Sequence, residues 1–245
     1  MRLPLFPFIC FAVFNLLSSA AKAVPVTLYD GSAAPEAQGW TRLAQGRPAV
    51  VTVGLTTTEF NTEGVDDRTS PQNQYSRTTG ESEFIFSINM LLVSASYNQL
   101  DGGFMLSPAA LAGGFSERTN SVTFAPGKLL WTDNTGPVFN VDTSVFHEYS
   151  IRYRGGNLDV FVDAPHADIV AGTAVPALSR PGVIFDAGRI PGIIQFGDFT
   201  NDANCNSHYV VDSITFDNFA VPEPAGALLM VGGLAGITLR RKRPC

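Results

Sequence analysis

The sequence contains few cysteines. Only 3 of its 245 residues are cysteine. Cys10 and Cys245 lie in terminal segments that we expect to be removed, so the mature chain would keep Cys205 alone. This excludes an internal disulfide, and stability must come from buried apolar side chains. We expect Cys205 to be a small, partly buried residue; a reactive thiol or an intermolecular bridge is the alternative.

Basic side chains are also scarce. The chain has 16 Lys and Arg against 22 Asp and Glu, a formal net charge of −6 and a pI of about 5.0. Removing a basic C-terminal end would make the mature chain more acidic still. This balance disfavours nucleic acid and anionic lipid surfaces as partners.

Helical periodicity is nearly absent between the two ends of the chain; Pro108–Ala112, with proline in first position, is the one candidate for a short helix. Alternation of apolar and polar residues is common instead and predicts strands. It is seen in Phe84–Met90 and most clearly in a hairpin of Tyr149–Arg154 and Leu158–Asp163 joined by Gly155-Gly156-Asn157. Further strands are expected at Val26–Tyr29, Val50–Thr56, Phe104–Ser107, Ser121–Phe124, Leu129–Thr132, Gly182–Phe185, Ile193–Phe196 and Val210–Phe219.

The number of short strands predicts the fold class. Residues 24–220 have the length of one larger all-β domain. About eleven strands without disulfides indicate an all-β, two-sheet antiparallel β-sandwich whose inner faces bury Phe, Val and Ile. Asp212 shares its parity with inward-pointing neighbours, so we expect it to point inward unless a bulge intervenes.

The N-terminus predicts export. Residues 1–23 combine a basic start, an apolar run over Leu3–Leu17 and the small-x-small pattern of Ala21 and Ala23. This is typical of a helical signal peptide removed by signal peptidase. A buried helix is the alternative, which Pro4 and Pro7 disfavour.

The C-terminus carries three signals in a fixed order over residues 221–245. An apolar run over Ala225–Leu239 is shorter than the roughly 20 apolar residues of a comfortable membrane span. Its basic end favours a cytoplasmic C-terminus. A short transmembrane helix that acts as a removable membrane stop is expected, and a permanent tail anchor is the alternative. The flanking signals are Val221, Pro222, Glu223 and Pro224 before the run, and Arg240, Arg241, Lys242 and Arg243 after it.

This order of signals resembles the PEP-CTERM sorting signal of Gram-negative bacteria. The resemblance implies recognition by an exosortase-type membrane protease. It also implies a cell-surface or extracellular destination after transient anchoring in the membrane, in bacteria that make exopolysaccharide and biofilm matrix.

The middle of the chain has a resemblance of its own. Phe146-His147-Glu148-Tyr149-Ser150-Ile151, followed by Gly155 to Asp163, resembles a hairpin of concanavalin A-like jelly rolls, the lectin, laminin-G and glucanase superfamily. Phe196-Gly197-Asp198 and Val210–Phe216 are similar to the final strand pair of those domains. The resemblance implies a jelly roll and a carbohydrate-related function, although fold alone does not establish function.

The motifs of a glycan-cleaving enzyme are missing. Glucanases of this superfamily carry E-x-D-x-E or E-x-D-x-x-E on one strand, because hydrolysis needs one protonated and one ionised carboxyl group. Glu81 and Glu83 share a face, but Ile85 stands where another acid is required, and a solvated start of a strand explains both. We therefore predict no catalytic residues.

The three histidines also lack a catalytic motif. His147 is expected to be a hydrogen-bonding side chain at the start of a strand, as in the jelly-roll family. His166 is expected in an exposed loop, and His208 before the last strand.

Binding remains as an expectation. Hard oxygen donors in one loop could hold Ca²⁺, although an ordinary turn uses the same residues; otherwise no cofactor is expected. Stacking aromatic and hydrogen-bonding side chains could bind polysaccharide, although each aromatic ring also suits a core. The calcium candidates are Asp198, Asn201, Asp202 and Asn204, and the glycan candidates are Tyr75, Tyr97, Trp131, Asp133, Asn134 and Tyr209.

The sequence therefore predicts an exported, non-catalytic carbohydrate-binding or structural module. A glycan hydrolase or lyase with an unrecognised site is the alternative, and an architectural protein that binds no sugar is the third possibility.

Overall fold

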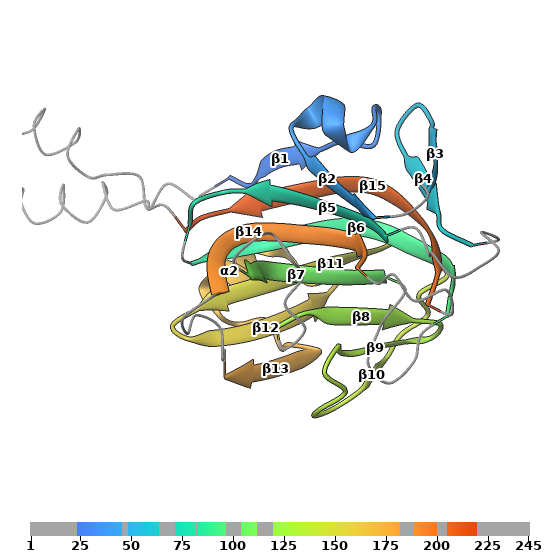
Figure 1. Ribbon diagram of the computed structural model, residues 1–245. Coiled ribbons are helices and arrows are strands. Elements are labelled where there is room, and N and C mark those ends of the chain that lie inside the picture. Colours follow the sequence, from blue (N-terminus) through green and yellow to red (C-terminus); the bar gives the residue numbers. More distant parts are fainter. Residues whose placement is uncertain are drawn as a thin grey trace, which may run out of the picture. The chain divides into compact units, whose positions relative to one another are not determined.

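Antiparallel strands form two facing sheets in the computed structural model of this protein (Figure 1). The described residues are 24–45, 49–63, 72–81, 83–96, 104–111, 120–181, 189–199 and 205–219. Residues 25–219 form one compact unit. Both predicted terminal segments lie outside the described residues, including Ala21, Ala23, the Pro-Glu-Pro element and the basic end. Within the described residues, no helix has the length and apolar character needed to cross a membrane.

Sheet A has eight strands. Seven follow one another in the spatial order β13 (Leu178–Pro181), β12 (Asn157–Val162), β11 (His147–Arg154), β6 (Phe84–Ala95), β15 (Ser207–Asp217), β4 (Thr58–Asn61) and β3 (Val50–Val53). The eighth, β1 (Val26–Tyr29), pairs with one half of β15, and β4 pairs with the other half.

Sheet B has seven strands. In spatial order they are β10 (Phe139–Asn140), β9 (Lys128–Trp131), β8 (Val122–Ala125), β7 (Phe104–Leu111), β14 (Arg189–Asp198), β5 (Gln72–Thr78) and β2 (Thr41–Gln45). Together the sheets confirm the predicted all-β, two-sheet antiparallel sandwich.

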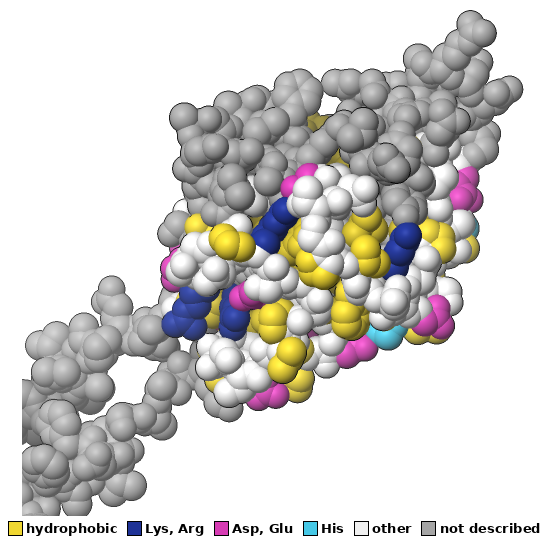
Figure 2. All heavy atoms as spheres, turned by 90° about the horizontal axis from the view of Figure 1, so that it is seen from below, with side chains coloured by type: hydrophobic (Ala, Val, Ile, Leu, Met, Phe, Trp, Pro, Cys, Tyr) yellow, Lys and Arg dark blue, Asp and Glu magenta, His cyan; other side chains and the backbone are white. Residues whose placement is uncertain are grey.

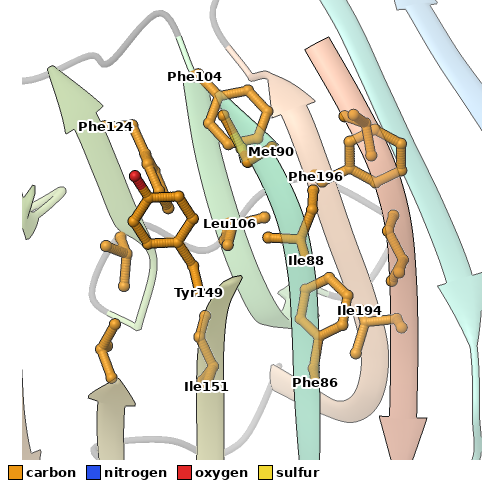
Figure 3. Close-up of a cluster of buried hydrophobic side chains, with 14 of the residues drawn as sticks. Phe86, Ile88, Met90, Phe104, Leu106, Phe124, Tyr149, Ile151, Ile194 and Phe196 are labelled. Atoms are coloured by element: carbon orange, nitrogen blue, oxygen red, sulfur yellow. The ribbon is translucent and has the colours of Figure 1, made fainter. Parts of the chain in front are cut away.

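The core lies between the sheets because alternate side chains of each strand point inward. Figure 3 shows the inward residues of β6 and β11 facing those of β7, β8 and β14. Tyr149 meets the ring of Phe124 edge-on, with the ring centroids 4.7 Å apart. The labelled core side chains are Phe86, Ile88, Met90, Phe104, Leu106, Phe124, Tyr149, Ile151, Ile194 and Phe196.

Two short helices complete the described unit. The 3-10 helix η1 (Pro35–Gln38) follows β1. The helix α2 (His166–Ala171) packs on the outer face of sheet A, where Ile169 joins Ile85 and Phe161 in a second apolar cluster.

The predicted hairpin is confirmed. β11 and β12 pair in register from Tyr149 opposite Val162 to Arg154 opposite Asn157. Gly155 and Gly156 adopt φ of 58° and 77°, the left-handed conformations that such a turn requires.

The predicted helix at Pro108–Ala112 is wrong, because β7 continues to Leu111. Pro108 lies beyond the residues of β7 that pair with β8, and opposite an irregular register in β14. A residue without an N–H group is tolerated at such a position.

The predicted strand Val50–Thr56 is too long. Gly54 donates a hydrogen bond to the Thr57 carbonyl oxygen at 2.8 Å, which turns the chain from β3 into β4.

The sequence patterns did not predict β2, β4, β5, β10 or β13. The predicted strand Gly182–Phe185 lies outside the described residues.

A bulge does intervene at Asp212. The register of β15 against β6 shifts between Val211 and Ser213, so that Val211 and Ile214 are buried while Asp212 is only half-buried. The Asp212 carboxylate accepts a hydrogen bond from the Asn89 side chain at 3.2 Å. An inward-pointing carboxylate is thereby avoided.

Candidate functional site

The outer face of sheet B is the first place to look for a binding or cleavage site, because its side chains alternate with those of the core. Core residues such as Tyr75, Phe104 and Phe196 point inward, so their neighbours along each strand point outward. The buried outward residues are Gln74, Met105, Ser107, Thr123, Leu130 and Gln195.

These outward side chains are amides, hydroxyls and apolar groups. Thr123 and Thr132 share a hydrogen bond between their hydroxyls at 2.9 Å, and Thr132 also contacts the sulfur of Met105 at 3.4 Å. None of the outward side chains described on sheet B is a carboxylate. Hydrolysis by a pair of carboxyl groups therefore has no support on this face.

Glu81 and Glu83 precede β6 rather than sharing a face of a strand. Glu83 accepts a hydrogen bond from the Gly155 amide at 2.9 Å, and Glu81 accepts one from the Asn218 side chain at 3.1 Å. Both carboxylates hold local structure, as expected for the start of a strand.

Three of the predicted sugar-stacking aromatic side chains belong to the core. Tyr75 and Tyr209 have no exposed surface, and Trp131 is 1% exposed. The predicted stacking role is therefore wrong for these three rings. Tyr75 and Tyr209 pack against other aromatic rings of the core, and Trp131 is buried in an inward position of β9. Tyr97 lies outside the described residues.

Among the described residues, the best candidate for sugar contact is the segment 132–135, which follows β9. Arg180 from β13 places its guanidinium 4.6 Å from the ring centroid of Trp131. It also donates hydrogen bonds to Asp133 at 2.9 Å and to the Thr135 hydroxyl at 2.6 Å. Asn134 is exposed between these two residues. We call Asp133, Asn134, Thr135 and Arg180 the edge cluster, because β9 and β13 lie near the edges of different sheets.

The edge cluster is held in shape by a local turn. The Asp133 carboxylate accepts hydrogen bonds from the Thr135 amide at 3.1 Å and from its hydroxyl at 2.7 Å. Burial by itself would raise the pKa of Asp133, but the hydrogen bonds from Thr135 and Arg180 lower the pKa below its ordinary value. The carboxylate is therefore ionised at neutral pH and keeps the turn closed.

Two further turns repeat this pattern without an arginine. Asp142 accepts hydrogen bonds from the amide and hydroxyl of Ser144, and Asp30 accepts the same pair from Ser32. These bonds lower the pKa of both carboxyl groups. Arg180, which the sequence analysis missed, distinguishes the edge cluster from these turns. No local pattern connects Arg180 with Asp133, because Arg180 lies in β13 while Asp133 lies in the turn after β9, far apart in the sequence.

Figure 2 views the side of the molecule where β10 and β13 lie in Figure 1. Basic side chains lie beside carboxylates there, separated by apolar and uncharged groups. On the described surface visible in this view, side chains of the two charges are interspersed.

The calcium prediction has one described member. Asp198 is buried and accepts a hydrogen bond from the Thr62 hydroxyl at 2.8 Å. Asn201, Asp202 and Asn204 lie outside the described residues. Among the residues that the structure does describe, no group of three or more metal-binding His, Cys, Asp or Glu side chains occurs.

Each of the three histidines lies beside a carboxylate. His147 begins β11, and its Nδ1 lies 2.5 Å from Asp163 while its Nε2 lies 3.0 Å from the Asp142 carbonyl oxygen. The predicted structural role at the start of a strand is confirmed by these contacts.

The positions predicted for the other two histidines are wrong. His166 begins α2 instead of lying in an exposed loop, and its Nε2 is 2.9 Å from the buried carboxylate of Asp217. His208 lies within β15, 2.6 Å from Glu59. Both histidines pair with carboxylates that are distant in the sequence, Asp217 and Glu59. Sequence spacing does not reveal such pairs.

Glu148 is the least engaged carboxylate described on the outer face of sheet A. Burial raises the pKa of Glu148, His166 lowers it and Asp163 raises it further. By contrast, Asp159 accepts hydrogen bonds from Arg152 at 2.7 Å and from Ser179 at 2.6 Å. One carboxyl group with a raised pKa is a feature of general acids.

Cys205 was expected to be partly buried, and the structure buries it completely.

No known protein-family profile matches this sequence, and no curated protein sequence matches it. Solved structures with similar folds include the exoplasmic/lumenal domain of VIP36 in its Ca²⁺/Man2-bound form, at 10% identity over 81% of this chain and 88% of that chain, with a TM-score of 0.46. A Bacillus licheniformis β-glucanase is 12% identical over 78% of this chain and 97% of that chain, with a TM-score of 0.45. A β-1,3-glucanase from Mycobacterium marinum is 12% identical over 80% of this chain and 100% of that chain, with a TM-score of 0.43. At these identities and TM-scores the matches carry no argument about the site.

Proposed function

We propose that this chain is an exported protein whose β-sandwich binds polysaccharide outside the cell without cleaving it. The edge cluster carries the binding part of the proposal. It presents the Asn134 amide between the ionised Asp133 and the Thr135 hydroxyl, next to Arg180. Such groups hydrogen-bond sugar hydroxyls, and their fixed geometry lowers the entropy cost of binding.

The absence of cleavage is supported by the chemistry of the outer face of sheet B and of the residues that precede β6. The described outward residues of sheet B include no carboxylate, and Glu81 and Glu83 already accept hydrogen bonds. A glycosidase with a carboxylate pair needs two such groups on opposite sides of the bond that it cleaves.

The destination is proposed from the terminal sequences. The signal peptide over residues 1–23 delivers the chain to signal peptidase, and residues 221–245 deliver it to an exosortase-type protease that removes the membrane stop. The sandwich then remains at the cell surface or in the extracellular matrix, in contact with exopolysaccharide.

Binding is tested with purified residues 24–220, which include the whole compact unit, on a glycan array with and without calcium. We expect a calcium-independent signal that falls about tenfold in Asn134→Gly, since one lost hydrogen bond of about 1.4 kcal/mol has that effect. Glycine tolerates the φ of 57° at this position, so the turn is preserved while the amide is removed.

Ser144→Ala is the matched control, because it alters the equivalent turn away from the edge cluster. Absence of binding to any glycan would remove the proposal. Equal losses in both variants would move the site away from the edge cluster.

A hydrolase on the same scaffold is the second candidate. Two carboxylates lie close together there, since Asp163 accepts a hydrogen bond from the Glu148 amide at 3.0 Å, and burial raises the pKa of Glu148. This candidate predicts release of reducing ends from the bound glycan and loss of that release in Glu148→Gln.

A further inference from the structure

The last residues of the sandwich are fastened to its outer face by contacts from several elements. Asp217 ends β15, and its carboxylate accepts a hydrogen bond from the Phe219 amide at 2.9 Å. The other oxygen of Asp217 lies 2.9 Å from Nε2 of His166 in α2. The Asp217 side chain is 2% exposed, so this contact is largely shielded from water.

Phe219 is held from two sides. Its ring packs against the apolar cluster that includes Phe161 and Ile169. The Arg154 guanidinium lies 4.7 Å from the centroid of the ring and donates a hydrogen bond to the Val170 carbonyl oxygen at 3.2 Å. Arg154 therefore joins the end of the strand to α2.

The backbone of Phe219 also indicates that it is held in place. Its φ is 52°, in a region that bulky residues rarely adopt unless the surrounding structure holds them there. The side-chain amide of the neighbouring Asn218 donates a hydrogen bond to Glu81 at 3.1 Å. These contacts fasten the chain up to residue 219.

The position of this attachment matters because Pro222-Glu223-Pro224 begins three residues after Phe219 in the sequence. A protease binds its substrate as an extended segment with residues on both sides of the scissile bond. When opening is fast, cleavage of a held segment follows the population of its open form. A cut near the Pro-Glu-Pro element would therefore fall within a few residues of the attached Phe219.

We infer that His166, Asp217, Arg154 and Phe219 form a clasp that limits proteolytic access to the start of the C-terminal tail. Opening of the clasp is then a step in maturation, so the sandwich itself regulates its own release. This inference rests on the proposed sorting of the chain.

The clasp itself is tested without the sorting protease. Full-length chain in detergent is treated with a proline-specific endoprotease, and cuts after Pro222 and Pro224 are followed by mass spectrometry. We expect Arg154→Gln and Phe219→Ala to be cut at least fivefold faster than the unchanged chain. Val175→Ala, at an exposed position after α2, should be cut at the unchanged rate. Equal rates for all four chains would overturn the clasp.

Its role in maturation is tested by pulse–chase labelling of the same variants in the producing cells. Faster conversion of precursor in Arg154→Gln supports the inference, and conversion at the unchanged rate overturns it. Arg154→Gln removes only a surface contact and remains informative if Phe219→Ala fails to fold.

Deletion of residues 240–243 should leave unprocessed precursor in the membrane. A precursor that is never shortened in any of these chains overturns both the sorting and the role of the clasp in maturation, while the endoprotease rates still decide whether the clasp exists.

Discussion

The Tyr149 side chain has a well-packed ring and a buried hydroxyl group without a hydrogen bond to any described residue. Its ring is fully buried against Phe124, where an edge-on contact adds about 0.5–1.5 kcal/mol to the effect of burial. Its hydroxyl has no hydrogen-bond partner among the described residues. Burial raises the pKa of this hydroxyl group, so it remains neutral over the physiological range.

Tyr149→Phe therefore removes an unpaired polar atom and keeps the ring. We expect the free energy of unfolding to stay the same or rise by up to about 1 kcal/mol, because an unpaired buried hydroxyl is costly. Urea unfolding at pH 7 measures this change. Tyr149→Leu is the control and should lower the free energy of unfolding by about 1–3 kcal/mol, through loss of the ring contact. A loss above 1 kcal/mol in the phenylalanine variant would show that the hydroxyl is bonded.

At the scale of elements, the loop after β1 is packed tightly against two parts of sheet A. A Cβ atom on Gly31 would lie 2.3 Å from the carbonyl oxygen of Thr56 and 2.6 Å from that of Asp212. The Gly31 carbonyl oxygen accepts a hydrogen bond from Thr58 at 2.9 Å. The loop thus contacts both the β3–β4 turn and the bulge of β15.

Gly31→Ala should lower the free energy of unfolding by at least about 3 kcal/mol, because backbone oxygens cannot move aside as a flexible side chain can. Gly127→Ala is a matched control: φ is positive at both glycines, at 70° and 76°, but a Cβ on Gly127 would meet nothing within 4 Å. It should cost only about 1–2 kcal/mol, the penalty of the left-handed conformation. Thermal and urea unfolding of both variants compare the two costs, and equal values would contradict the tight contact.

For the whole molecule, two buried tyrosines are expected to make stability fall at alkaline pH. Burial raises the pKa of Tyr29 to about 12, and it also raises the pKa of Tyr149. Between pH 10 and 12 these groups keep their protons in the folded chain, while tyrosines of the unfolded chain, with a pKa near 10, lose them. The unfolded state then binds fewer protons, so the free energy of unfolding falls as pH rises.

The expected slope is about 1.4 kcal/mol per pH unit for each such tyrosine above pH 10. Urea midpoints measured from pH 8 to pH 11.5 determine it, and absorbance of tyrosinate at 295 nm should increase together with unfolding. The Tyr29→Phe and Tyr149→Phe double variant should have a shallower slope. Unchanged midpoints above pH 10 would contradict the burial of these two hydroxyls.

The predicted features that the structure confirms depend on neighbours in sequence. Strand alternation in Phe84–Met90 and the turn at Gly155 and Gly156 follow from local geometry, and both occur as predicted. The site was much harder to predict. Asp133 and Asn134 were identified, but Arg180 comes from a strand of the other sheet.

The sequence by itself determined that this protein is an antiparallel β-sandwich, because period-two patterns and turn residues act within a few positions along the chain. Only the tertiary structure decided that Tyr75, Trp131 and Tyr209 are core residues rather than exposed stacking surfaces. Alternation specifies that a side chain lies on one face of a strand. Whether that face meets another sheet or a ligand depends on strands distant in sequence, which no local pattern encodes.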